Sequence, residues 1–154
     1  MSFWHNKAID LAVSGKEQVI YIYGKAGNGK TEVALYICQA VKGRVQAGTG
    51  TGKATSNFNG PTLYVMFGWA HNEQNQSVLK ANKENKLDNL KKFYGHIDIF
   101  IIDEVNAMSA AELGLLDETI GKIFNPDEKL KKQNWTVKPF GGKTMVFVRG
   151  CSLA

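Results

Sequence analysis

Val19-Ile20-Tyr21-Ile22-Tyr23-Gly24-Lys25-Ala26-Gly27-Asn28-Gly29-Lys30-Thr31 is the stretch of sequence that decides the fold. Its first part, Val19 to Tyr23, is β-branched or aromatic throughout and predicts a buried strand. The rest matches the phosphate-binding loop pattern G-x-x-x-x-G-K-[ST] in full. Apolar residues then recur at helical spacing from Lys30 to Val41, which predicts a helix. A strand, a glycine-rich loop and a helix in this order predict a site for the phosphates of a nucleotide.

Each residue type in the loop has a physical reason. Gly24, Gly27 and Gly29 let the backbone turn tightly and point its N–H groups inward. The helix that follows adds its positive N-terminal end. Lys30 is expected to reach the β- and γ-phosphates, and the Thr31 hydroxyl to ligate magnesium. The whole loop is therefore predicted to bind the nucleotide, most simply ATP with Mg²⁺: Gly24, Lys25, Ala26, Gly27, Asn28, Gly29, Lys30 and Thr31. The alternative is a glycine-rich turn that merely joins a strand to a helix.

A second motif follows residues 97–102, a predicted buried strand in which Ile99 to Ile102 are all apolar and which ends at Asp103 and Glu104. An aspartate at this position is expected to hold the magnesium ion, and the glutamate beside it to orient and deprotonate the attacking water. Kinases do not need a water-activating glutamate, so the pair favours hydrolysis, with Lys30 and Glu104 as the catalytic residues. The alternative is two carboxylates in a solvated turn.

The remaining sequence alternates helices with strands. We expect helices over 4–14, 61–69 and 109–124, strands over 44–47 and 144–148, a loop over 48–61, and a mobile polar connection followed by a helix over 71–95. Such alternation implies a parallel sheet with right-handed crossovers, in which ligands bind beyond the carboxyl ends of the strands. The predicted fold class is α/β, a three-layer P-loop NTPase domain with a mainly parallel central sheet.

Local signals refine two of these helices. Ser109 followed by Glu112 forms a capping-box pattern at the start of helix 109–124. The expected apolar face of that helix comprises Leu113, Leu116, Ile120 and either Ile123 or Phe124. The expected apolar anchors of the 71–95 segment are Leu79, Leu87, Leu90 and Phe93.

Composition places the chain among single-domain globular proteins. It has 154 residues, of which 44% are hydrophobic and 21% charged, and this length argues against two full domains. A net charge of +5 and a pI of about 9.2 favour polyanionic partners. Two cysteines, Cys38 and Cys151, are too few for a disulfide framework and favour an intracellular setting. The sequence shows neither a signal peptide nor an apolar stretch that spans a bilayer, so no membrane partner is expected.

The segment Phe100-Ile101-Ile102-Asp103-Glu104-Val105-Asn106-Ala107-Met108-Ser109 resembles the second motif of superfamily 1 DNA helicases. It is most similar to the petite-integration-frequency (PIF) branch and to the helicase domains of Helitron transposons. Thr51-Gly52-Lys53-Ala54 resembles the family's motif Ia, and Pro139-Phe140-Gly141-Gly142-Lys143 resembles its approach to motif III. The resemblance runs from Ile20 to Val148.

The resemblance implies a RecA-like first motor domain of an ATP-dependent DNA helicase. The implied cofactors are ATP and Mg²⁺. The implied partner is single-stranded DNA or a tailed duplex, and the implied direction of movement is 5′ to 3′. Repair, recombination and telomere maintenance are the implied roles, with a nuclear location if the source is eukaryotic. No obligate protein partner is evident. The candidate DNA contacts are Thr51, Gly52, Lys53 and Phe67, although Phe67 can equally belong to the core.

Three departures from the family pattern bear on function. Gly50 stands where the family has proline, and Tyr64-Val65 where it has His-Ser. After the last strand the family continues Gly-Asp-x-x-Gln-Leu, whereas this sequence reads Arg149-Gly150-Cys151-Ser152-Leu153-Ala154. We therefore expect residues 1–154 to form one incomplete motor domain, without the second motor domain and its arginine.

Two other interpretations stay open. One is a nucleotide-binding remnant of a helicase or transposon that has no motor activity. The other is a stand-alone P-loop ATPase or kinase, which would leave the segments resembling motifs Ia and III unexplained. The lysines at 80, 83, 86, 91 and 92 fit either a track for a phosphate backbone or a solvated helix face.

Overall fold

The computed structural model describes residues 3–16, 18–24, 29–50, 60–71, 73–74, 77–79, 86–124 and 138–149. The predicted helices and strands are present, with boundaries that shift by a few residues. In chain order the elements are α1 (Phe3–Ser14), β1 (Val19–Ile22), α2 (Lys30–Ala40), β2 (Val45–Thr49), α3 (Leu63–Phe67), β3 (Trp69–His71), β4 (Ser77–Leu79), α4 (Lys86–Tyr94), β5 (Ile99–Asp103), η1 (Val105–Ala107), α5 (Ala110–Phe124), η2 (Pro139–Gly142) and β6 (Thr144–Val148).

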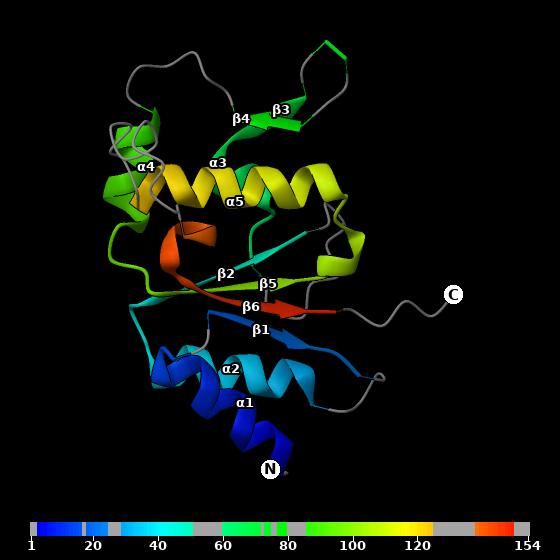
Figure 1. The fold of residues 1–154 in the computed structure, drawn as a ribbon, viewed down its shortest axis with the longest axis vertical. Coiled ribbons are helices and arrows are strands. Elements are labelled where there is room, and N and C mark those ends of the chain that lie inside the picture. Colours follow the sequence, from blue (N-terminus) through cyan, green and yellow to red (C-terminus); the bar gives the residue numbers. More distant parts are fainter. Residues whose placement is uncertain are drawn as a thin grey trace.

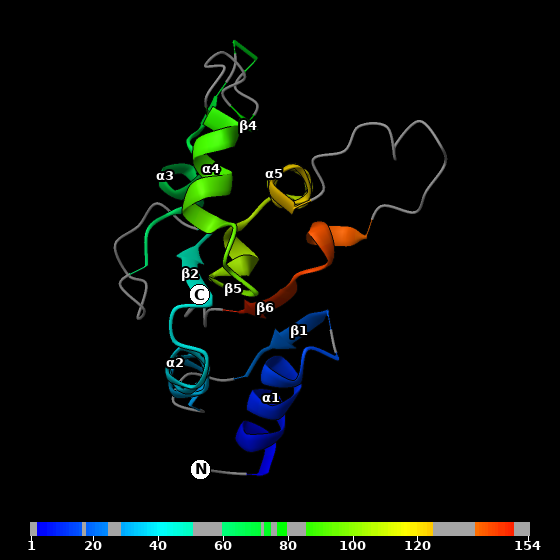
Figure 2. The same ribbon diagram turned by 90° about the vertical axis from the view of Figure 1, so that its left-hand side faces the viewer.

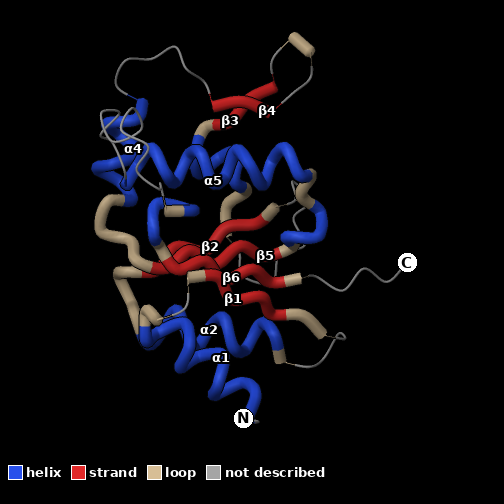
Figure 3. The backbone as a smooth tube through the Cα atoms, viewed as in Figure 1, coloured by secondary structure: helices blue, strands red, loops and turns tan. Residues whose placement is uncertain are grey.

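The central sheet has the strand order β1-β6-β5-β2 (Figure 3). All of its pairs are parallel. The register places Ile22 opposite Val148, Ile102 opposite Phe147, and Thr49 opposite Asp103. The carboxyl ends of the strands therefore meet at one edge of the sheet. The predicted α/β class with a mainly parallel sheet is confirmed.

Helices cover both faces of this sheet and give it three layers (Figures 1 and 2). The layer of α1 and α2 packs against Ile99, Ile101, Val146 and Val148. The opposite layer, which includes α3, α4 and α5, packs against Phe100, Ile102, Met145 and Phe147. Successive residues of β5 and β6 thus serve different cores, which is why these strands are apolar at nearly every position.

β1 differs from the buried strand that its sequence predicts. Val19 and Tyr21 are 48% and 47% exposed, whereas Ile20 is buried against the α1–α2 layer. β1 lies at the edge of the sheet, where its partner is β6. One face of β1 is therefore left without the cover that β5 and β6 receive, and an apolar sequence alone does not reveal this.

The segment after α3 also differs from prediction. β3 and β4 pair antiparallel as a small separate sheet, where we expected a mobile connection. Figure 1 shows this hairpin beyond α5, on the side away from the central sheet. In α4, Leu90 is buried as expected, but Phe93 is 73% exposed and Tyr94 is buried instead. The predicted face of α4 therefore holds at Leu87 and Leu90, and only its last position moves, from Phe93 to Tyr94.

α5 connects these parts. Its capping box is confirmed, because the Glu112 N–H donates to Ser109 Oγ and the Ser109 N–H donates to Glu112 Oε1, both at 3.1 Å. On the apolar face Leu116, Ile120 and Ile123 are buried as expected, whereas Leu113 is 36% exposed and Leu115 is buried instead. α5 also contacts η2, where Phe140 N–H donates to Asp117 Oδ1 at 2.6 Å.

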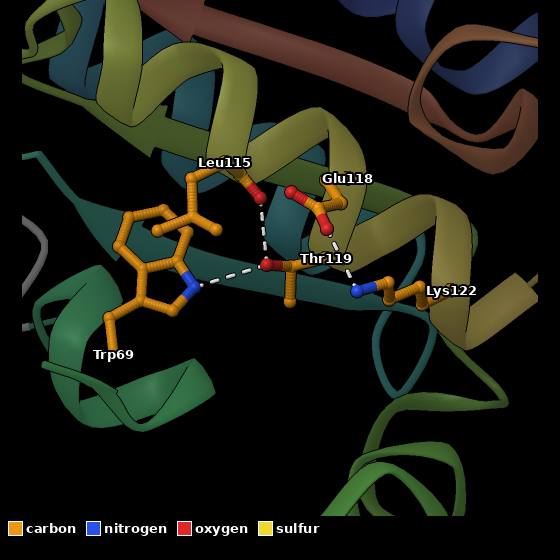
Figure 4. A network of polar contacts seen from close by, with 5 residues as sticks. All are labelled: Trp69, Leu115, Glu118, Thr119 and Lys122. Atoms are coloured by element: carbon orange, nitrogen blue, oxygen red, sulfur yellow. Dashed lines mark hydrogen bonds and ion pairs between the residues drawn. The ribbon is translucent and has the colours of Figure 1, made fainter. Parts of the chain in front are cut away.

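A buried polar contact ties the start of the hairpin to α5. Trp69 Nε1 donates to Thr119 Oγ1 at 3.1 Å, and the Thr119 hydroxyl donates to the Leu115 carbonyl at 2.7 Å (Figure 4). Both side chains are almost fully buried. Their polar groups are thus satisfied within the core, which fixes the position of β3 on α5. Among the described residues, no helix is long and apolar enough to cross a membrane.

Candidate active site

Four chain segments with polar or glycine residues converge at the carboxyl edge of the central sheet. Gly24 follows β1, Lys30 begins α2, Gly50 follows β2, and Asp103 ends β5. This is the edge at which ligands bind in open parallel sheets. The two motifs singled out in the sequence therefore belong to one site.

The described part of the phosphate loop comprises Gly24 and Gly29 to Thr31; residues 25–28 lie outside the described residues. Gly29 has a φ of 78°, in the left-handed region that favours glycine. Lys30 Nζ donates to the Gly24 carbonyl, so its side chain reaches across the loop. Thr31, half-buried, is in the first turn of α2, where backbone N–H groups have no partner within the helix.

The structure also places His5 at this loop, which the sequence did not indicate. A Cβ built on Gly29 would lie 2.9 Å from Cε1 of His5 and 3.0 Å from its Nε2. His5, Lys30 and Tyr23 line a pocket of about 910 Å³ between α1, β1 and the start of α2. The contact joins residues far apart in the sequence, and no local pattern predicts it.

Asp103 and Glu104 lie side by side in different surroundings. Asp103 is 4% exposed, and its Oδ1 accepts the Glu104 N–H at 2.8 Å. Glu104 has a φ of 55°, which is uncommon for a residue with a side chain. Backbone strain of this kind is concentrated at functional sites.

The electrostatic surroundings of Glu104 connect the two motifs. Burial and, after it, the charge of Asp103 raise the pKa of the Glu104 carboxyl, whereas the charge of Lys30 lowers it. Lys30 is therefore close enough to Glu104 to influence its ionisation. A raised pKa suits a carboxylate that accepts a proton from water.

The donor groups at this edge fit a nucleotide with Mg²⁺. A lysine in a glycine loop suits phosphate, while a hydroxyl and a buried carboxylate are the hard oxygen ligands that Mg²⁺ prefers. The described residues contain no group of three or more His, Cys, Asp or Glu side chains that could hold a metal ion. In proteins Mg²⁺ usually keeps several waters and binds through one or two carboxylates together with the phosphates of the nucleotide.

A family model described as PIF1-like helicase matches residues 4–150. This chain belongs to the PIF1-like helicase family. The match covers both motifs and the segments that resemble motifs Ia and III. It favours the helicase interpretation over a stand-alone P-loop ATPase or kinase, and it supports ATP binding by a P-loop NTPase fold.

Solved PIF1-like helicases share the fold. A structure of two coordinating Pif1 helicases at forked double-stranded DNA is 24% identical, with a TM-score of 0.69 over 97% of this chain and 33% of that one. Bacteroides Pif1 bound to single-stranded DNA is 22% identical, with a TM-score of 0.69 over 96% and 31%. Pif1 from Candida albicans is 23% identical, with a TM-score of 0.66 over 97% and 32%.

These likenesses confirm a RecA-like α/β fold for this member of the PIF1-like family. The chain spans about a third of the length of the solved helicases that it matches.

The predicted DNA contacts have two different outcomes. Thr51, Gly52 and Lys53 lie outside the described residues. Phe67 is 0% exposed and packs between Trp69, Tyr94 and Phe100, so the prediction that it stacks on a base is wrong. Its position in the short helix α3 points the ring into the core, which a helix of five residues does not reveal from sequence.

Tyr64, which stands where the family has histidine, has a structural role here. Its hydroxyl donates to Glu112 Oε2 at 3.1 Å, and its ring contacts those of Trp69 and His71. Tyr64 therefore links α3 and the hairpin to the first turn of α5. Val65, which replaces the family's serine, is 74% exposed.

Proposed function

We propose that this chain binds ATP with Mg²⁺ and hydrolyses it, as the first motor domain of a PIF1-like DNA helicase. The observation that carries the proposal is the convergence of Lys30, Asp103 and Glu104 at one edge of the sheet, with Lys30 close enough to affect the Glu104 pKa. The family match over residues 4–150 supports it. A solved Bacteroides Pif1 in complex with ADP-AlF4 is a relative of the same fold.

In this mechanism the residues of the site divide into those that hold phosphate, those that would hold Mg²⁺ and the one that activates water. Lys30 and the loop amides hold the phosphates and neutralise the charge that develops on the transferring phosphoryl group. The Thr31 hydroxyl and the Asp103 carboxylate would hold Mg²⁺, which when bound neutralises phosphate charge. Glu104, in its ionised form, orients a water molecule and accepts its proton as the water attacks the γ-phosphorus, while the bond from the γ-phosphorus to the bridging oxygen breaks and ADP leaves.

The activity on DNA follows from the family and is also a proposal. Solved relatives are bound to single-stranded DNA or described at forked duplexes. We propose the same partner for this chain, with Thr51, Gly52 and Lys53 as candidate contacts. The proposal also includes movement from 5′ to 3′ and roles in repair, recombination and telomere maintenance. If the source is eukaryotic, it includes a nuclear location.

The phosphate-loop assignment is tested by Lys30→Ala. Loss of a charge-assisted contact to phosphate should weaken ATP affinity about 10- to 100-fold. Isothermal titration with ATP and Mg²⁺ measures this. Lys42→Ala, which removes an exposed lysine beyond the other end of α2, is the matched control and should bind as the wild type does. Equal affinity of the wild type and Lys30→Ala would overturn the assignment.

A second candidate function is nucleotide binding without motor activity. The observation that favours it is the sequence after β6, where Arg149 and Gly150 stand in place of the family's Gly-Asp. A purified protein of residues 1–154 is expected not to separate a 5′-tailed duplex, because an arginine from a second motor domain contributes several orders of magnitude to turnover. A strand-separation assay with ATP decides, and clear unwinding would exclude this second candidate.

A further inference from the structure

Gly50 makes an unusually close approach to the segment that carries the catalytic carboxylates. It follows β2 directly, and its N–H donates to the Asp103 carbonyl at 2.9 Å. A Cβ built on Gly50 would lie 2.9 Å from the Glu104 carbonyl oxygen and 2.5 Å from Met108 Cγ. Distances under 3.0 Å essentially do not occur for real Cβ atoms, so any side chain at position 50 must displace something.

The need for glycine here comes from space and not from backbone conformation. The φ of Gly50 is not positive, so an alanine could adopt its backbone angles. Met108 is a flexible side chain that can turn away from a new methyl group. The Glu104 carbonyl is backbone, and it cannot move without moving the residue that carries the catalytic carboxylate.

The peptide of Glu104 is held on several sides. Its N–H donates to Asp103 Oδ1 at 2.8 Å, and its carbonyl accepts the Ala107 N–H at 2.9 Å. A side chain at position 50 would press on the same carbonyl, because a Cβ there would lie 2.9 Å from its oxygen. The left-handed φ of 55° at Glu104 persists because these surroundings determine it.

The geometry points to Gly50 as a positioning residue for ATP hydrolysis, one that sets the backbone of Glu104 and thereby the place of its carboxylate. This inference rests on the proposed hydrolytic role of Glu104. The requirement for glycine is particular to this chain, in which Met108 and the Glu104 carbonyl occupy the space that a side chain at position 50 would need, whereas the family's motif Ia has proline there.

The test is Gly50→Ala in the full chain. Hydrolysis should slow about tenfold, since a misplacement of a catalytic group by about 1 Å can cost about 100-fold in rate and a smaller shift costs less. ADP affinity should stay within about twofold, because the phosphate loop is not touched. Rates are measured in single turnovers with the protein in excess over radiolabelled ATP, and ADP binding by titration. Gly114→Ala, an exposed α5 glycine with nothing within 4 Å of an added Cβ, is the matched control.

Two further variants show whether Gly50 acts through Glu104. In a Glu104→Gln background, Gly50→Ala should cause no additional loss of rate, because the group that it positions has gone. Met108→Ala should not rescue Gly50→Ala, because the Glu104 carbonyl would still be 2.9 Å from the new Cβ.

The outcomes separate this inference from the proposed function. If Glu104→Gln hydrolyses ATP as fast as the wild type, the proposed function fails, and this inference fails with it. If Glu104→Gln is slow while Gly50→Ala keeps the wild-type rate, the inference alone is overturned. Full rescue by Met108→Ala would also overturn it, because the effect would then come from crowding of the Met108 side chain.

Discussion

Glu104 shows how a single residue is prepared for its proposed task. Burial and the Asp103 charge both favour the protonated carboxyl and raise its pKa, and Lys30 offsets part of this. Because the water-activating form is the ionised one, hydrolysis should decline on acidification at a pH above that of an ordinary glutamate. A pH profile of single-turnover hydrolysis measures this. A loss of activity only at or below the pKa of an ordinary glutamate would contradict this prediction.

The same shift has a consequence for stability. A carboxyl whose pKa is raised in the folded state binds more protons there than when unfolded, so the ionised form opposes folding. The stability that Glu104 contributes is present below its unfolded pKa and is lost as pH rises through the folded pKa. Glu104→Gln should therefore unfold at a higher temperature than the wild type at neutral pH, and the difference should shrink in acid. A thermal-unfolding series across pH measures both.

At the scale of elements, the contact between Trp69 and Thr119 joins β3 to α5 through buried polar groups. Thr119→Val keeps the shape but leaves the buried indole N–H without its acceptor, which costs about 1–3 kcal/mol. Thr119→Ser keeps the hydroxyl and should lose less. Urea unfolding measures the two differences, and equal stability of Thr119→Val and the wild type would show that the indole finds another partner.

The elements also show what the sequence could and could not predict. Strands β5 and β6 were clear because they are buried on both faces and are apolar at nearly every position. The β3–β4 hairpin was missed because Ser77 to Leu79 is short and the surrounding sequence is polar, so no alternation stands out. On α4 and α5 the predicted faces were displaced at Phe93 and Leu113. Helical spacing fixes a stripe, but tertiary packing decides which of two adjacent stripes is buried.

At the scale of the whole molecule, the sequence could predict the site residues that belong to a continuous motif. It could not predict the contacts that only the folded chain brings together. Lys30 and Asp103 belong to local patterns whose strands end at one edge of a parallel sheet. The approach of His5 to Gly29, and of Gly50 to Glu104, depends on how layers pack over that edge. Such contacts join residues that are far apart in sequence, and no spacing rule reports them.

The exposed edge of β1 has a consequence for the behaviour of this chain in solution. Within the described residues β1 is the terminal strand of the central sheet, with β6 as its partner, and its Val19 and Tyr21 side chains are exposed. An unpaired apolar strand edge acts as a template for another strand. At high concentration, copies of residues 1–154 would self-associate through this edge, and a charged residue in place of Val19 would act as a gatekeeper against aggregation.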